Sequence, residues 1–598
     1  MIYQALYDLA QREQLVDDPA FEPAPVAYLI KLGRRGEYLG YSAPRIEPLV
    51  DKKGKPKGRA KPPVRPVPRR SDRTVQDQAE FLVDKAEYVF GIDPTGKRAP
   101  SKLAIRKQLF RDQVAAALIA VPCNALRAVV DFLDQPIPGE LETVIAPAKE
   151  SEKGERAGEL FAFVYEPDGG TQAVHDEPPI RTWFAQRFAA TEASVRGQCL
   201  VTGLEDVPLT RLHAKPKNIP PKSKTKGGVP LTSVNSDAFK SYLMDEVQCA
   251  PISRKANIAV ETALNRLLDP TYKKPDGTTC PPRSVVISSD TAFLFWSRDD
   301  SALDFLLQLD RQTPEHIAQL LRSPFERRHA PLDDPSAFYA LMLSGAQGRA
   351  IVRSFITSTV EGVARAVDRY RVEVKIVRPF GEPPGSFSLL DYRRALVPRR
   401  DLDLLPPALA TDLYLSIILG RPFAQSILQA IVRRNRAELL PKLENSDRRD
   451  DLLLATRCSL LKAWLIRNRK ENLAVSLDRQ RTDPPYRLGR LLAVIDRLQQ
   501  TALGDNINAT LVDRYYGSAS STPEAVFPTL LRRSQHHMGK LRREKPGLAV
   551  NTEKLLEEIV ADLPRFPKTM TLEEQGLFAL GFYHQRQDFF PRKETEEN

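Results

Sequence analysis

The sequence lacks the features that mark secreted, membrane-spanning and zinc-stabilised proteins. Only five of its 598 residues are cysteines, and no two of them form a Cys-x-x-Cys pair. An odd, scattered set of this kind predicts neither a disulfide framework nor a zinc ribbon, and it is typical of a reducing compartment. No apolar run approaches the roughly 20 residues needed to cross a bilayer, and the N-terminal segment lacks the apolar centre of a signal peptide. We therefore expect a cytoplasmic protein without a membrane partner.

Signatures of catalysis are also missing. The sequence contains no Walker loop, dinucleotide-binding glycine pattern, nucleophile elbow or His-Glu-x-x-His motif. The adjacent His536 and His537 would point about 100° apart on a helix with no acidic cluster beside them, which argues against a metal site. Acids such as Asp290, Asp391 and Asp513 have no partner at the spacing that a metal-dependent nuclease needs. We expect a non-catalytic protein that holds no metal and no cofactor.

The patterns that are present predict an α+β fold. With 42% hydrophobic residues the chain can build real cores, and its length allows two to four domains. Apolar runs rich in β-branched and aromatic residues at 160–165 and 285–296 predict strands. Segments 338–343 and 372–376 flank a periodic segment at 347–367, which suggests a strand-helix-strand unit.

The character of the sequence changes at about Ser388. Strand signals fade there, and leucine-rich helical segments follow to the end of the chain. This change predicts a mixed N-terminal region followed by a C-terminal α-helical bundle. The predicted domains are residues 1–385, 386–476 and 477–598, the last two being parts of the bundle.

The net charge of +12 is clustered, and the densest cluster is the stretch 52–73, which has ten Lys or Arg against one Asp. Its glycines and prolines favour an extended arm that builds no core of its own, and predicted structure on both sides makes it a loop. The cations of such an arm can bind the phosphates of a nucleic acid, although a solvated surface loop is the simpler alternative. The candidate contacts are Lys52, Lys53, Lys55, Lys57, Arg59, Lys61, Arg69, Arg70 and Arg73, with Gln76 and Gln78 at its root able to read base edges.

A second basic loop has the same design. It carries cations without an intervening acid, is interrupted by prolines and closes at a Gly-Gly pair. Ser233 and Asn235 follow it, and each could cap a helix or contact DNA, Asn235 at a phosphate or a minor-groove base edge. The cations of this loop are Arg211, His213, Lys215, Lys217, Lys222, Lys224 and Lys226.

Two helices of the predicted bundle carry further cations. Arg487 and Arg490 are expected to point away from the apolar stripe of the helix at 486–503. A later helix has a comparable surface, formed by Arg532, Arg533, Lys540, Arg542 and Arg543. Ordinary solvation of a surface helix explains such faces equally well.

Several segments resemble one known family, the large subunit of the type I-C CRISPR effector complex, or I-C Cascade. They run nearly from end to end of the chain, and the last two are long and idiosyncratic. The segments are FLVDKAEYVFG at 81–91, CLVTG at 199–203, RLH at 211–213, SVNSDAFKSY at 233–242, YRLGRLLAV at 486–494, DRYYGSASSTPEAVFPTLL at 513–531 and EQGLFALGFYHQRQDFF at 574–590.

The resemblance implies a non-enzymatic subunit at the foot of a crRNA-bound complex. Such a subunit recognises the protospacer-adjacent motif (PAM) on double-stranded DNA, helps to start strand separation and offers a surface to a helicase-nuclease. The implied partners are target DNA, crRNA indirectly, the backbone and crRNA 5′-handle-binding subunits, small subunits and the helicase-nuclease. Arg211, His213 and Asn235 lie in matched motifs and become candidate DNA contacts, while the cations of the bundle become candidates for holding the displaced strand. The arm at 52–73 is longer and richer in proline than the family pattern.

The resemblance also implies that the last helices can be made separately as a small subunit from an internal start. The matched block begins near Val475 and Leu477, and codons for either residue can serve as bacterial starts. Two other functions remain open: a nucleic-acid-binding scaffold without sequence preference, and a divergent metal-dependent nuclease.

Overall fold

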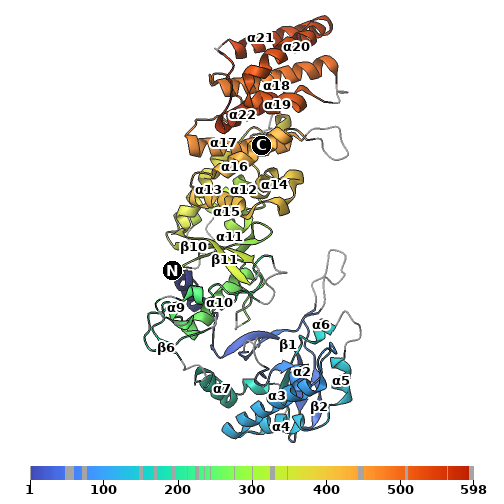
Figure 1. Cartoon of the computed structure of the whole chain (residues 1–598), viewed down its shortest axis with the longest axis vertical. Coiled ribbons are helices and arrows are strands. Elements are labelled where there is room, and N and C mark those ends of the chain that lie inside the picture. Colours follow the sequence, from blue (N-terminus) through green and yellow to red (C-terminus); the bar gives the residue numbers. More distant parts are fainter. Residues whose placement is uncertain are drawn as a thin grey trace. The chain divides into compact units, whose positions relative to one another are not determined.

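The structure is a computed structural model and describes residues 2–590 with internal gaps (Figure 1). The gaps are 48–59, 71–76, 147–152, 168–171, 191–194, 212, 222–227, 235, 241, 243, 245, 275–276, 300, 323–329, 347, 442–449, 505–508, 562 and 564. The chain divides into two compact units. Unit 1 comprises Met1–Ala214, Thr232–Arg266 and Thr271–Cys280, and unit 2 comprises Lys215–Leu231, Leu267–Pro270 and Pro281–Asn598.

Unit 1 is built on a five-stranded sheet with the order β2-β1-β5-β4, in which β3 also pairs with β1. The pairing of β1 with β5 is parallel, and the other pairings are antiparallel. The strands are β1 (Phe21–Leu32), β2 (Tyr38–Ser42), β3 (Val64–Pro68), β4 (Asp84–Lys85) and β5 (Leu160–Tyr165). The predicted strand at 160–165 is confirmed, and all of its residues except the last are buried.

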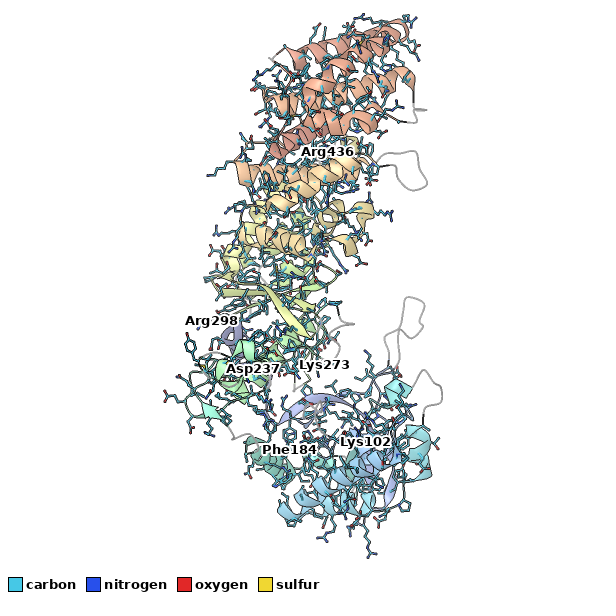
Figure 2. The ribbon with its side chains drawn as sticks, in the orientation of Figure 1. Lys102, Phe184, Asp237, Lys273, Arg298 and Arg436 are labelled. Carbon is cyan, nitrogen blue, oxygen red and sulfur yellow. The ribbon has the colours of Figure 1, made fainter. Side chains whose placement is uncertain are left out.

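Several helices of unit 1 pack on one face of this sheet. Phe110 of α3 and Phe132 of α4 meet Phe163 of β5 in the main core of the unit. Phe184 of α7, which Figure 2 labels, adds to this core by stacking on Phe81, with ring centroids 5.2 Å apart. The helices that contribute to this core are α2 (Ala86–Val89), α3 (Pro100–Ala120), α4 (Asn124–Leu133), α5 (Gly139–Ile145) and α7 (Pro178–Ala190). The other elements described in unit 1 are α1 (Ile2–Arg12), α6 (Lys153–Arg156), α9 (Glu246–Cys249), α10 (Arg254–Leu268) and the short strands β6 (Arg196–Gly197) and β7 (Val207–Pro208).

Unit 2 begins with a four-stranded antiparallel sheet in the order β11-β10-β9-β8. The strands are β8 (Ser284–Val286), β9 (Thr291–Ser297), β10 (Ala337–Ala346) and β11 (Arg349–Thr359). The run at 285–296 was predicted as one strand but forms two, because the chain turns at Ser288 to Asp290. The predicted strand-helix-strand unit is also wrong: β10 and β11 pair directly, and helix α13 (Val360–Val374) covers 372–374.

The remainder of unit 2 is helical, which confirms the α+β fold and the change near Ser388. Ser388 caps α14 through a reciprocal pair of hydrogen bonds with Asp391. The helices besides α13 are α11 (Asp304–Gln308), α12 (Pro314–Arg322), α14 (Leu389–Ala395), α15 (Pro407–Leu419), α16 (Gln425–Ala437), α17 (Asp451–Arg469), α18 (Pro484–Leu503), α19 (Leu511–Ser521), α20 (Pro523–Glu544), α21 (Pro546–Val560) and α22 (Leu572–Asp588). Within the described residues, no helix has both the length and the apolar character needed to cross a membrane.

The predicted boundaries at 385 and 476 both fall inside unit 2. A buried network joins residues across the first boundary, since Asp310 accepts hydrogen bonds from both Arg393 and Tyr414 at 2.7 Å. Across the second, the Val377 carbonyl accepts from the Tyr583 hydroxyl at 2.6 Å. One continuous core therefore runs from the sheet to α22.

Candidate nucleic-acid interface

Part of the first basic stretch is a strand, which corrects the expectation that it builds no core. Strand β3 pairs with β1 along its length, from Val64 opposite Pro25 to Pro68 opposite Phe21. Val67 is fully buried in a cluster with Ala24 and Val26 on the second face of the sheet. Prolines are tolerated here because β3 pairs only with β1 among the described strands, so its other edge needs no backbone donors for a second strand.

Arg69 anchors the strand to the start of β1. Its Nε donates to the Pro19 carbonyl at 2.7 Å, and its Nη2 donates to the Phe21 carbonyl at 3.1 Å. Arg70 donates from Nε to Glu22 Oε1 at 2.7 Å. Burial lowers the pKa of Arg69, partly offset by the charge of Glu22. Both arginines were expected to contact phosphate, but their hydrogen bonds instead hold the arm to the sheet.

The far end of the stretch is held by a buried arginine that the sequence did not single out. Arg106 of α3 donates from Nε to Asp77 Oδ1 at 3.0 Å and also pairs with Glu87. Its guanidinium lies 4.9 Å from the centre of the Tyr88 ring. Asp77 immediately follows the segment 71–76, so Arg106 fixes the root of the arm. No local pattern reveals this role, because Asp77 is 29 residues away in the sequence.

Of the remaining candidates in the first stretch, the structure describes only two. Lys61 and Gln78 are exposed, as a DNA contact requires. The backbones of Lys61 and Ile46 exchange two hydrogen bonds, of 2.7 and 3.2 Å, which close the base of segment 47–60. The others lie outside the described residues; they are Lys52, Lys53, Lys55, Lys57, Arg59, Arg73 and Gln76.

The second basic loop is also closed at its base by the backbone. The Val229 amide donates to the Pro216 carbonyl at 3.2 Å. Gly228 has a φ of +84°, and a Cβ there would lie 2.6 Å from the Lys215 carbonyl oxygen, so only glycine fits this approach. The segment between these contacts carries Lys222, Lys224 and Lys226, which lie outside the described residues, as does Asn235.

The described candidates around this loop differ in exposure. Arg211 and Lys217 are exposed, while Lys215 and Ser233 are half-buried. His213 is only 6% exposed, and burial lowers its pKa. The burial of His213 does not fit the predicted DNA contact, because it limits access to the imidazole and disfavours the charged form.

Arg487 and Arg490 of α18 are buried rather than exposed, which corrects a second prediction. Arg490 is fully buried and donates to Gln585 Oε1 at 3.0 Å and to Glu558 Oε1 at 2.7 Å. Arg487 donates to the Glu558 carbonyl at 3.2 Å. Every residue from Pro485 to Asp496 is buried, so α18 has no solvated side in this part. These arginines hold α21 and α22 and cannot reach a displaced strand.

The cations of α20 do form an exposed surface. Arg532 and Arg543 are exposed and form no ion pair with any residue that the structure describes. Arg533 donates to the Tyr515 hydroxyl at 2.7 Å, and Arg542 donates to Glu553 Oε1 at 2.7 Å. Lys540 lies 3.9 Å from Glu544. This helix face presents net positive charge and matches the predicted cationic surface.

No group of three or more His, Cys, Asp or Glu side chains in the described part of the chain has an arrangement suited to a metal ion. The candidate nucleic-acid contacts lie on three separate surfaces: the two basic loops closed at their bases and the exposed face of α20.

Comparison with known families gives the class of the protein: it is CRISPR-associated. A family model described as CRISPR-associated protein (Cas_Csd1) matches residues 2–590, and the chain belongs to this family. It is a large subunit of a Cascade complex, which confirms the resemblance carried by the motifs. No curated protein matches the chain.

Proposed function

We propose that this chain is the PAM-recognition subunit of a type I-C, crRNA-guided antiviral complex in the cytoplasm. It binds double-stranded target DNA, promotes strand separation and R-loop formation, and helps to recruit the helicase-nuclease without catalysing a reaction itself. Its other partners are the backbone and 5′-handle-binding subunits, small subunits and, indirectly, crRNA. The family supports membership of the complex, and the two closed basic loops are the observation that supports DNA binding.

The backbone hydrogen bonds that hold both ends of each basic loop favour its binding to a DNA duplex. A loop whose ends are already held loses less conformational entropy when its cations become ordered on phosphates. Phosphate contacts set the position on the duplex, and contacts from Asn235 or Gln76 to base edges in the minor groove supply the PAM preference. The binding energy offsets the few kcal/mol that unstacking the first base pairs costs, after which guide pairing reads the sequence.

The test uses the assembled complex and short duplexes that carry or lack a PAM. Asn235→Ala and Gln76→Ala should reduce the preference for the PAM duplex while leaving the salt dependence of binding unchanged. Gln480→Ala, at an exposed position of the bundle, is the matched control. Reversing the charge of both loops should abolish target binding at physiological ionic strength, and unchanged binding would refute the proposal.

A scaffold without sequence preference is the second candidate. The exposed face of α20 favours it, because Arg532 and Arg543 present charge but no pattern that reads bases. Under this alternative the two alanine substitutions weaken binding equally on all duplexes. A divergent nuclease is the third, less favoured candidate; metal-dependent DNA cleavage by the pure chain would establish it.

We also propose that residues 477–598 are made separately as a small subunit from a start at Val475 or Leu477. The structure adds a requirement for such a product. In the full chain, Arg586 of α22 pairs with Asp451 of α17 at 2.6 and 3.1 Å, and a Cβ at Gly576 would lie 2.9 Å from Leu461. A separate segment must cover this face with another subunit. Absence of a ribosome-binding site upstream of these codons would count against the internal start.

A further inference from the structure

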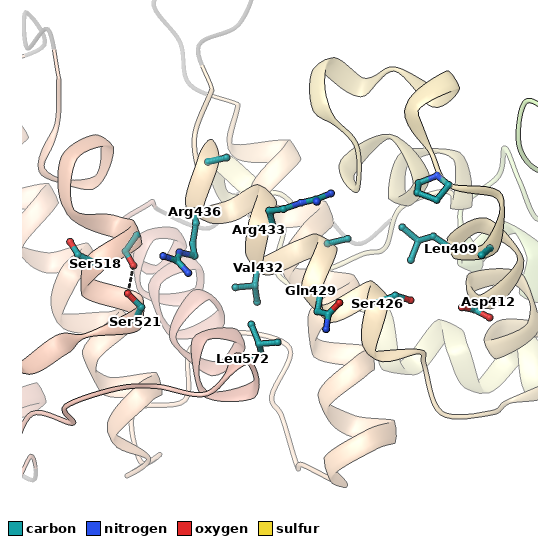
Figure 3. A pocket seen from close by; sticks show the side chains of 15 residues that line it. Leu409, Asp412, Ser426, Gln429, Val432, Arg433, Arg436, Ser518, Ser521 and Leu572 are labelled. Atoms are coloured by element: carbon teal, nitrogen blue, oxygen red, sulfur yellow. Dashed lines mark hydrogen bonds between the residues drawn. The ribbon is translucent and has the colours of Figure 1, made fainter.

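An open groove of about 1030 Å³ lies among the helices of unit 2 (Figure 3). Helix α16 forms one wall, and α15, α19 and the first residue of α22 contribute the rest. Leu409, Val432 and Leu572 give it an apolar lining. Val432 is almost fully buried, whereas Leu572 is half-buried at the groove.

One face of α16 carries the polar side of the groove. Ser426, Gln429, Arg433 and Arg436 recur at intervals of three or four residues and all are exposed (Figure 3). With a rise of 1.5 Å per residue, this row is about 15 Å long, or nearly three helical turns. The polar row is therefore long enough to line nearly three turns of a docked helix.

The guanidinium groups of the two groove arginines can donate hydrogen bonds to a ligand. Neither Arg433 nor Arg436 forms an ion pair or side-chain hydrogen bond with any residue that the structure describes. On the facing helix, the Ser518 and Ser521 hydroxyls donate to the carbonyls of Tyr515 and Gly517 in their own helix. Gly517 leaves space beside Arg436, since a Cβ there would still be 4.0 Å from Arg436 Nε. An acidic group entering here meets two guanidinium groups.

A carboxylate lies at the other end of the groove. Asp412 of α15 lines it, and no described side chain pairs with this carboxylate. Burial raises the pKa of Asp412. In Figure 3 it lies beyond Leu409, away from Ser518 and Ser521. Positive and negative charge are thus separated along the groove by apolar side chains.

We infer that this groove binds an amphipathic α-helix of a partner protein. Acidic residues of that helix lie against Arg433 and Arg436, apolar residues enter between Val432 and Leu409, and a basic residue lies against Asp412. A nucleic-acid strand fits less well, because no aromatic side chain among the described residues lines the groove for base stacking and Asp412 repels phosphate. The inference concerns a protein-docking surface and does not rest on the proposed DNA contacts.

A designed peptide tests the groove on the full chain. The probe is a fluorescein-labelled helix of 16 residues with leucines at positions i, i+4, i+7 and i+11, glutamates in its first turn and lysines in its last turn, an order that also suits the helix dipole. We expect measurable binding by fluorescence anisotropy, and at least tenfold weaker binding to the Arg433→Glu/Arg436→Glu variant. A partner peptide with the charges exchanged should bind the variant better than it binds the wild-type chain.

The control is Arg497→Glu/Arg565→Glu, which makes the same charge change at two exposed positions outside the groove. It should leave peptide binding unchanged. The proposal is overturned if the wild-type chain does not bind the first peptide, or if the control weakens binding as much as the groove variant. It is also overturned if the groove variant loses affinity for a 20-nucleotide oligothymidylate but not for the peptide, since the groove would then be a nucleic-acid site.

Discussion

Gly489 of α18 lies directly against the Phe578 carbonyl of α22. A Cβ at position 489 would lie only 2.0 Å from that oxygen, and one at Gly581 would lie 2.1 Å from the Tyr486 carbonyl oxygen. The two helices therefore cross with their backbones in contact, and a glycine from each makes the crossing possible. Both glycines belong to motifs that carry the family resemblance.

Gly489→Ala should destabilise unit 2 by at least about 2 kcal/mol, because the added methyl group forces two packed backbones apart. Thermal unfolding and urea unfolding measure the effect. Gly539→Ala in α20 is the matched control, since a Cβ there would have no described atom within 4 Å. The control should gain about 0.5–1 kcal/mol from the higher helix propensity of alanine. Equal stability of the two variants would contradict this account of the crossing.

Arg490→Gln should lower the stability of unit 2 by about 2 kcal/mol, because Gln585 loses the donor to its buried amide oxygen. The half-exposed Glu558 regains water and adds less to the loss. The affinity of the folded chain for single-stranded DNA should be unchanged. If the variant is as stable as the wild type but binds DNA more weakly, Arg490 contacts nucleic acid after all.

Arg532→Gln/Arg543→Gln should weaken the binding of single-stranded DNA without lowering the stability of unit 2. Both side chains are exposed, so the melting temperature should stay within experimental error of the wild type. If both arginines contact phosphates of a single strand, the slope of log affinity against log salt should fall by about 0.7 for each. Fluorescence anisotropy with labelled oligothymidylate at several salt concentrations measures this slope. An unchanged slope would mean that these cations are only solvated.

Acid should destabilise the bundle through His584. This side chain is 2% exposed and shares a hydrogen bond of 2.9 Å with the Tyr486 hydroxyl, and burial lowers its pKa to about 3. Below the ordinary pKa of about 6.5 the unfolded chain binds a proton that the folded chain does not, so stability falls as the pH falls. The contribution is about 1.4 kcal/mol between pH 7.5 and 5.5.

His584→Gln removes the titrating group. The loss of unfolding free energy between pH 7.5 and 5.5 should become smaller by this amount, whatever the absolute stability of the variant. Urea unfolding at several pH values compares the two proteins. An identical slope would show that His584 has the same pKa in the folded and the unfolded chain.

Local patterns predicted the broad fold but not the partners of its strands. The apolar run at 160–165 is a strand, and the change to helices near Ser388 coincides with the capped start of α14. The segment 347–367 has a helical period, yet 349–359 pairs with β10. The residues of β11 are rich in β-branched side chains, which favour a strand, so the error was to extend the helical period of α13 back over them. Which strand β11 pairs with is not contained in any local window.

The sequence by itself determined the family, the order of mixed region and bundle, and the places where positive charge gathers, because each of these depends on residues close together in the chain. Only the tertiary structure decided which cations face solvent. Arg490 is buried by Glu558 and Gln585, which are 68 and 95 residues away, while Arg532 on a similar helix stays exposed. A helical period distinguishes an apolar side from a polar one, but it cannot reveal that α18 is enclosed by other helices and that its arginines find their partners there.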